Sequence, residues 1–191
     1  MVVTFAVVCS SNNNRSMEAH CVLRDNGFQV NSFGTGNMVR LPGTAQDRPN
    51  NYKFGTPYEQ MYTELKSQDE NYYGQRGILK MLDRNRRIKL APERFQESKK
   101  HFDVVISCEE RVFDAICEEL MMRGGEHNRP VHIVNVEIRD NHEDAAVGGQ
   151  QILDLANMIV AADDMDESMQ DILEKFQQKY GDILLHSVSF Y

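Results

Sequence analysis

The sequence predicts an α/β domain with three layers, in which helices cover both faces of a mainly parallel central sheet. Two short β-branched apolar runs without polar alternation, VVTFAVVC at 2–9 and FDVVISC at 102–108, are typical of parallel strands that are buried on both faces. Segments with helical periodicity separate these and the other predicted strands, and such alternation is typical of a parallel sheet. A chain of 191 residues suits one domain, 1–191, with a sizeable core.

Turn-forming residues mark the ends of the first predicted strand, helix and strand. After the strand at 2–9, helical spacing runs over about 16–26, and Asn26 with Gly27 supplies a stop. FQVNSFGTG at 28–36 then predicts a second strand that ends at a glycine pair. The first 36 residues therefore resemble a β-loop-α-β unit.

The next segment, 37–95, is expected to be a loop and helical insertion over one sheet edge. Residues 37–56 are rich in proline, glycine and asparagine, which predicts a loop without regular elements. Two helices are expected at 57–73 and 77–90. Their apolar residues that are expected to face inward are Met61, Leu65, Ile78, Met81 and Leu82.

The second half returns to alternating strands and helices. Its predicted elements are a strand at 102–108, a helix at 109–123, a strand at 131–138, helices at 149–162 and 165–180, and an added edge strand at 183–190. The helix at 109–123 ends at a glycine pair.

Composition excludes several classes of function. The formal net charge of −8 does not favour general nucleic-acid binding, which needs a basic face. No stretch approaches the ~18 to 20 apolar residues of a membrane span, and no secretory signal begins the chain, so an intracellular protein is expected. The four cysteines show no CxxC pair or zinc-like spacing, which favours reduced thiols without a metal or another cofactor.

The motif CSSNNNRS at 9–16 is the strongest chemical signal. Ligands of open α/β sheets bind where strands end and helices begin, and Cys9 is expected at such a point. Amides of the small polar loop can form an anion-binding nest, Arg15 can close it with a bidentate fork, and the positive field favours a nucleophilic thiolate at Cys9. The Cys-x5-Arg-Ser pattern therefore predicts a cysteine-dependent phosphatase. The residues expected around the phosphate are Ser10, Ser11, Asn12, Asn13, Asn14 and Ser16.

Such chemistry also needs an acid that protonates the departing oxygen. The segment IRDNHEDA, after the strand at 131–138, offers Asp140, Glu143 and Asp144. Asp140 is nearest to the end of the strand and is the preferred acid, while His142 is an alternative.

Many longer blocks carry a family resemblance that spans nearly the whole chain. They are CSSNNNRSMEAH, GTG followed by RLPG, MLDRNRRIK, PERFQ, CEERVFD, RPVHIVNVEIRDNHEDA and LHSVSFY. Together they resemble the Ssu72 phosphatases, which act on the C-terminal domain of RNA polymerase II. The resemblance implies a core like that of low-molecular-weight tyrosine phosphatases, no metal, a nucleophile at Cys9, a phosphate-binding arginine at Arg15 and a general acid at Asp140.

The same resemblance implies a substrate and partners. The family removes phosphate from the fifth-position serine of the polymerase repeat when the following proline is cis. It docks on symplekin within the cleavage and polyadenylation machinery, which implies a nuclear protein that does not bind RNA itself. The peptide groove is expected beside Arg40, Leu41 and Pro42, with Met81 on its opposite wall.

Two features depart from the family pattern, namely Cys21 in the first helix and the GGQQ segment at 148–151, which suits a diverged paralogue. Two other functions remain open on the residues alone. An arsenate reductase would use the same anion loop with resolving thiols, for which Cys108 and Cys117 make a poor pair. A phosphopeptide-binding adaptor would keep the nest without turnover.

Overall fold

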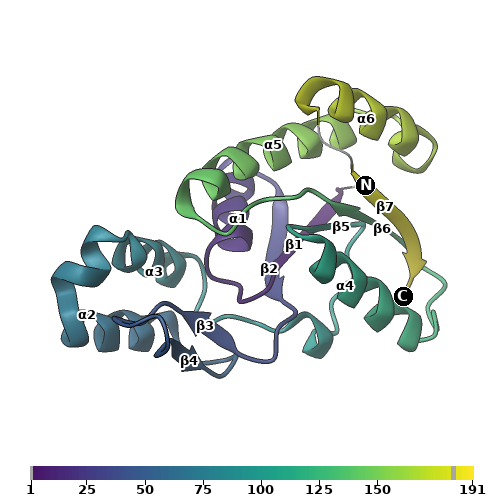
Figure 1. Cartoon of the computed structure of the whole chain (residues 1–191). Helices are drawn as coiled ribbons and strands as arrows, with labels where there is room; N and C mark the ends of the chain where they lie inside the picture. Colours follow the sequence, from purple (N-terminus) through teal and green to yellow (C-terminus); the bar gives the residue numbers. More distant parts are fainter. Residues whose placement is uncertain (1, 182–183) are drawn as a thin grey trace.

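The computed structural model describes residues 2–181 and 184–191, and its centre is a five-stranded sheet with the order β2-β1-β5-β6-β7 (Figure 1). The first four of these strands run parallel, and β7 pairs antiparallel with β6. The strands are β1 (Thr4–Cys9), β2 (Gln29–Gly34), β5 (Val104–Ser107), β6 (Pro130–Asn135) and β7 (Leu185–Phe190). The predicted mainly parallel sheet and its added edge strand are thus confirmed, although Ile183 of the predicted edge strand lies outside the described residues.

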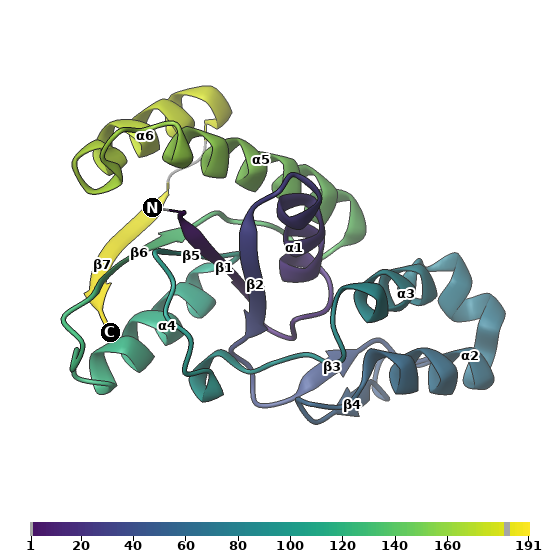
Figure 2. The same ribbon diagram turned by 180° about the vertical axis from the view of Figure 1, so that it is seen from behind.

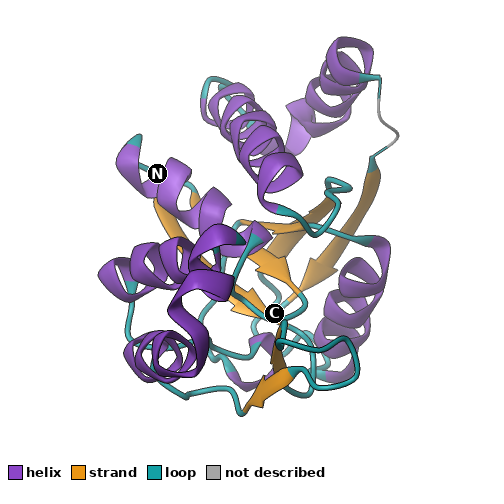
Figure 3. Ribbon diagram, turned by 60° about the vertical axis from the view of Figure 1, so that its left-hand side comes forward, coloured by secondary structure: helices purple, strands orange, loops and turns teal. Residues whose placement is uncertain are grey.

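Helices cover both faces of the sheet, as the α/β class requires (Figures 2 and 3). One face carries α1 (Arg15–Asp25), α5 (His142–Val160) and α6 (Met165–Tyr180), and the other carries α4 (Glu110–Met122) with the short η1 (Phe95–Glu97). Side chains alternate along a strand, so Phe5 and Val7 of β1 pack under α1 and α5, whereas Ala6 and Val8 face α4. Among the described residues, none of the helices combines the length and apolarity needed to cross a bilayer.

Beyond the β2 edge, the insertion forms its own small core (Figure 1). It contains β3 (Val39–Leu41), β4 (Asn50–Tyr52), α2 (Tyr58–Gln75) and α3 (Ile78–Ile88). The residues predicted to face inward are all buried there. The expectation of a loop without elements over 37–56 was wrong, because β3 and β4 pair as an antiparallel ribbon. Strands of three residues are too short to show a period of two.

The start of α5 also differs from the prediction. The helix begins at His142 instead of 149, because the Asn141 side chain accepts a hydrogen bond from the Asp144 amide and caps it. Gly148 and Gly149 lie inside the helix, where they allow close packing. A Cβ on Gly148 would lie 2.4 Å from Ile138 Cδ1, and one on Gly149 would lie 3.3 Å from Glu18 Cγ on α1.

Candidate active site

The loop of residues 10–14 joins β1 to α1 at the carboxyl end of the sheet and forms the floor of a pocket. The pocket is lined by Cys9, Ser11, Asn13, Asn14, Arg15, Arg40, Leu41, Pro42, Ile78, Met81, Asp140, Asn141 and His142. These residues come from the core fold and from the insertion. The pocket therefore lies where the two parts meet.

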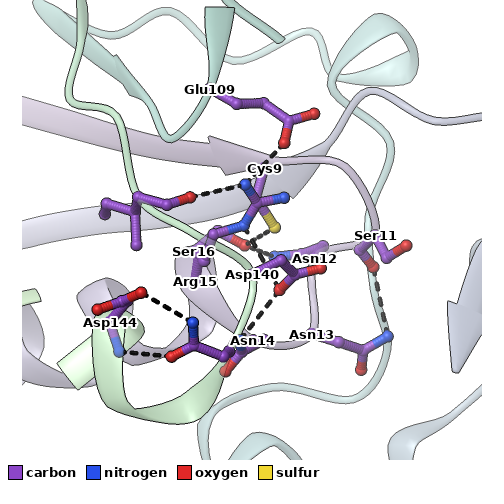
Figure 4. Close-up of polar contacts among 12 residues, drawn as sticks. Cys9, Ser11, Asn12, Asn13, Asn14, Arg15, Ser16, Glu109, Asp140 and Asp144 are labelled. Carbon is purple, nitrogen blue, oxygen red and sulfur yellow. Dashed lines mark hydrogen bonds and ion pairs between the residues drawn. The ribbon is translucent and has the colours of Figure 1, made fainter. Parts of the chain in front are cut away.

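Cys9 is the last residue of β1, and its side chain reaches the floor of the pocket (Figure 4). Its Sγ lies 3.0 Å from Ser16 Oγ in the first turn of α1. The Ser16 hydroxyl accepts a hydrogen bond of 2.9 Å from Asn12 Nδ2, so its own proton is free to point at the sulfur. A hydroxyl that donates to Sγ stabilises negative charge on it.

The loop is held in its curled shape by contacts to the rest of the chain. Asn12 is fully buried and has a left-handed φ of +53°, a conformation that asparagine tolerates. Its carbonyl accepts the Tyr58 hydroxyl proton, and its Oδ1 accepts from the Glu93 amide at 3.1 Å. Two side chains of α3, Arg84 and Asn85, donate to the Asn13 carbonyl at 2.9 Å each. The insertion thus braces the loop.

The glycines of the GTG segment let a second loop approach the first. The Gly36 amide donates to the Ser10 carbonyl at 3.0 Å. A Cβ on Gly34 would lie only 2.6 Å from that carbonyl oxygen. A larger residue at Gly34 would therefore push the two loops apart.

Arg15 is a buried charge, 4% exposed, that the fold holds from one side. Its Nη1 donates to Glu109 Oε2 at 2.7 Å and to the Ile138 carbonyl at 3.0 Å. In the described part of the chain, Nε and Nη2 have no hydrogen-bond partner, and Nε is buried. Burial opposes the charge, but Cys9, Glu109 and Asp140 outweigh it and raise the pKa of Arg15 above its ordinary value. Among the described residues, Nε and Nη2 make no hydrogen bond, although the Asp140 carboxylate lies 3.5 Å from Nε, and they offer the fork that two phosphate oxygens would need.

Asp140 lies on the rim of the pocket, with a side chain that is 65% exposed. Its Oδ1 accepts from Asn14 Nδ2 at 3.0 Å and lies 3.5 Å from Arg15 Nε (Figure 4). Asp144, by contrast, accepts from the Asn141 side chain in the helix cap. The His142 ring is bonded to the Arg76 carbonyl. Of the candidate acids, Asp140 is the one whose carboxylate contacts the arginine that would hold the phosphate.

The structure separates the predicted phosphate-binding residues into two groups. Ser11, Asn13 and Asn14 line the pocket, together with the predicted groove residues Arg40, Leu41, Pro42 and Met81. The side chains of Asn12 and Ser16 form the network behind Cys9, and the Ser10 carbonyl packs on the GTG segment. Whether the loop amides bind phosphate stays a prediction.

Sequence reasoning missed three residues of the site, namely Ile78 and Asn141, which line the pocket, and Glu109, which binds Arg15. Glu109 could have been found, because it follows the strand beside β1 and so lies at the same sheet edge. Asn141 carries the N-cap signal of an asparagine before an acidic turn. Ile78 carried no such signal, because an apolar residue on a helix indicates only packing.

The other cysteines are not among the residues that line the pocket. Burial raises the pKa of Cys108, Cys21 and Cys117, and Cys108 is fully buried. Cys108 packs in the same hydrophobic cluster as Cys9, whereas Cys117 packs on the opposite face of the sheet. The pair that a thiol relay would need is therefore divided by the sheet. Within residues 2–181 and 184–191, no group of histidine, cysteine and acidic residues could hold a metal ion.

Comparisons with known proteins match nearly the whole chain. The family described as Ssu72-like protein matches residues 3–191. The human RNA polymerase II C-terminal domain phosphatase SSU72 is 53% identical over 186 residues, which cover 97% of this chain and 96% of that protein. The Schizosaccharomyces pombe protein of the same name is 52% identical over 188 residues, which cover 97% and 95%.

A solved structure extends the likeness to three dimensions. It is the Drosophila melanogaster Ssu72 with symplekin, bound to a cis peptidomimetic phosphoserine-5 peptide of the CTD. It superposes with a TM-score of 0.96 at 46% identity and covers 99% of this chain and 98% of that chain. The pocket described above therefore lies in a fold that is shared along the entire chain.

Proposed function

The chain belongs to the Ssu72 family, and we propose that it removes phosphate from the fifth-position serine of the RNA polymerase II C-terminal-domain repeat when the following proline is cis. The observation that carries this proposal concerns Arg15, which lines the same pocket as Cys9 and whose Nε and Nη2 make no hydrogen bond within the described residues. A phosphoryl group on that fork occupies the same pocket as the Cys9 sulfur.

The mechanism has two steps. The Cys9 thiolate attacks phosphorus in line while Arg15 and the loop amides hold the equatorial oxygens, and Asp140 protonates the departing serine oxygen. The sulfur–phosphorus bond forms as the oxygen–phosphorus bond breaks, which leaves a phosphocysteine. Asp140 then takes a proton from water, the water oxygen attacks phosphorus, and phosphate leaves with the thiolate restored.

The insertion, 37–95, supplies the rest of the proposed substrate groove. Leu41 is buried and Pro42 exposed on one segment of the lining, while Met81 and Ile78 come from α3. These apolar side chains suit the proline that follows the phosphoserine. We extend the proposal to a nuclear role, with symplekin as partner in mRNA 3′-end processing and no direct contact with nucleic acid.

Phosphate release from repeat peptides tests the proposal. Peptides phosphorylated at each serine in turn are assayed with and without a prolyl isomerase. We expect release from the fifth-position phosphoserine, and faster release with the isomerase, because cis X–Pro bonds make up ~10 to 30% of unfolded peptides and exchange slowly. Cys9→Ser should bind the peptide without turnover.

Three results would contradict the proposal. Equal release from every phosphoserine would remove the assigned substrate. Peptide binding without release by the unmutated protein would instead identify a silent adaptor, and thiol-consuming turnover of arsenate alone would identify a reductase.

A further inference from the structure

His142 connects two walls of the pocket that come from distant parts of the sequence. It is the first residue of α5 and follows Asp140 by two positions. Its Nε2 lies 2.9 Å from the carbonyl oxygen of Arg76, the residue that ends α2. Since a carbonyl only accepts, Nε2 carries the proton and donates it.

The histidine ring also packs at the junction between α2 and α3. Gly77 begins α3 with a left-handed φ of +72°, and a Cβ at this position would lie 3.2 Å from His142 Cδ2. Glycine thus permits both the turn and the close approach of the ring. The contact fixes the start of α3 beside the segment that carries Asp140.

Towards its other end, helix α3 is attached to the loop of residues 10–14, because Arg84 and Asn85 donate hydrogen bonds to the Asn13 carbonyl. Between these two attachments it presents Ile78 and Met81 to the pocket. The distance between this wall and Asp140 therefore depends on the attachment at His142.

Among the described residues, the Asp140 carboxylate makes two polar contacts. One is the Asn14 hydrogen bond, and the other is the 3.5 Å approach to Arg15 Nε. A bound phosphoryl oxygen would take Nε, so the second contact is weakened when the acid is needed. The placement of Asp140 then relies on Asn14 and on the backbone that leads into His142.

We propose that His142 is a positioning residue, whose hydrogen bond to the Arg76 carbonyl sets Asp140 against the α3 wall so that the leaving serine oxygen lies within reach of the acid. The inference rests on the proposed function, because it assumes that Asp140 is the acid. It predicts an effect only where the leaving group needs a proton.

The test compares a phosphoserine-proline peptide with p-nitrophenyl phosphate, whose phenolate leaves without much assistance. His142→Ala should lower kcat for the peptide about three- to tenfold, the range that one hydrogen bond is worth, and leave kcat for the aryl ester unchanged within about twofold. His142→Gln should restore the peptide rate, because the glutamine amide can donate to the same carbonyl. Gln150→Ala, an exposed change further along the same helix, is the matched control.

Equal losses on both substrates, no loss on the peptide, or the same loss in Gln150→Ala would overturn the inference. Denaturant midpoints of the variants show whether each is folded, and the His142→Gln rescue still decides if His142→Ala is unstable. Asp140→Asn distinguishes a failure of the His142 inference from a failure of the proposed function. If Asp140→Asn does not slow the peptide selectively, the acid assignment itself is wrong.

Discussion

At the scale of single residues, the orientation of the Arg15 guanidinium depends on Glu109. Glu109 and the Ile138 carbonyl bind Nη1, which leaves Nε and Nη2 without a hydrogen bond in the described part of the chain. Because Glu109 already holds the Arg15 side chain in place, the guanidinium loses little conformational entropy when phosphate binds. Substitutions at Arg15 therefore test the proposed phosphate-binding group, and substitutions at Glu109 test the residue that orients it.

Arg15→Lys should keep a positive charge but lose the bidentate fork. We expect kcat for the phosphoserine peptide to fall by about 10²- to 10³-fold, the cost of removing one preorganised transition-state donor. Steady-state phosphate release measures this. A loss smaller than about threefold would mean that charge alone suffices and that the fork has no role.

Glu109→Gln should weaken the hold on Arg15 without removing the arginine. A charge-assisted hydrogen bond becomes a neutral one, so we expect kcat/KM to fall about tenfold. Glu110→Gln, one residue further on, is the control, because Glu110 begins α4 and is exposed. If both variants lose the same activity, the effect belongs to the charge of the helix end and not to Arg15.

Site residues that are close together in the sequence could be predicted from it, whereas contacts between those that are far apart could not. Cys9 and Arg15 are linked by a short loop, so their spacing alone places both at one anion site. Glu109 is separated from Arg15 by 94 positions, and only the parallel pairing of β1 with β5 brings them together. Asp140 was preferred over Asp144 from the sequence because it is nearest to the end of the strand, and the structure adds that the Asp144 carboxylate accepts a hydrogen bond from Asn141 in the helix cap.

At the scale of elements, long buried strands and amphipathic helices were predicted well, and short or glycine-containing elements were not. The strands β1 and β5 are continuous apolar runs, which few other structures produce. The ribbon of β3 and β4 has three residues in each strand and gives no periodic signal. The start of α5 was misplaced because Gly148 and Gly149 imitate a helix boundary, although they serve close packing.

Gly148 gives a direct test of that packing. Alanine would gain ~1 kcal/mol of helix propensity, but its Cβ would lie 2.4 Å from Ile138 Cδ1 and 2.6 Å from Cγ1. Overpacking of a core costs about 1 to 3 kcal/mol, so Gly148→Ala should destabilise the protein by up to about 2 kcal/mol in urea unfolding. It should also lower activity, because Ile138 supplies a carbonyl to Arg15.

The control for this change is Gly74→Ala. Gly74 also lies in a helix, but a Cβ there would meet no atom within 4 Å. This variant should therefore gain stability by roughly 0.5 to 1 kcal/mol. Adding Ile138→Val to Gly148→Ala removes Cδ1 and should recover part of the loss, and a failure to do so would mean that the clash is elsewhere.

At the scale of the whole molecule, composition and helical periodicity predicted the insertion but not its contacts with the loop of residues 10–14. Arg84 and Asn85 on α3 hydrogen-bond to the carbonyl of Asn13, and Tyr58 on α2 holds that of Asn12. Polar residues on exposed-looking helices carry no sign of such contacts in a single sequence. The packing of the insertion against the anion loop therefore had to come from the structure.

The pH dependence of stability is a further property of the entire fold. His20 on α1 is 8% exposed and its Nδ1 lies 2.8 Å from Ser32 Oγ on β2. Burial, followed by the positive charges of Lys89 and Arg24, lowers the pKa of His20 from 6.5 to about 4, against a smaller opposing effect of Glu93. The folded protein thus keeps this histidine neutral in a range where the unfolded chain protonates it.

Because the unfolded state binds the additional proton, the free energy of unfolding should fall as pH drops from about 6.5 to 4, and it should be fully retained above 6.5. The shift corresponds to a loss on the order of 3 kcal/mol over this window. Burial also lowers the pKa of His186 and of His101, which adds to the same trend. Urea unfolding at half-unit pH steps measures the slope.

His20→Gln keeps a polar side chain beside Ser32 but cannot titrate, so its slope between pH 6.5 and 4 should be shallower than that of the unmutated protein. Identical slopes would show that His20 is solvated or already paired when charged, and that the acid sensitivity arises at other groups.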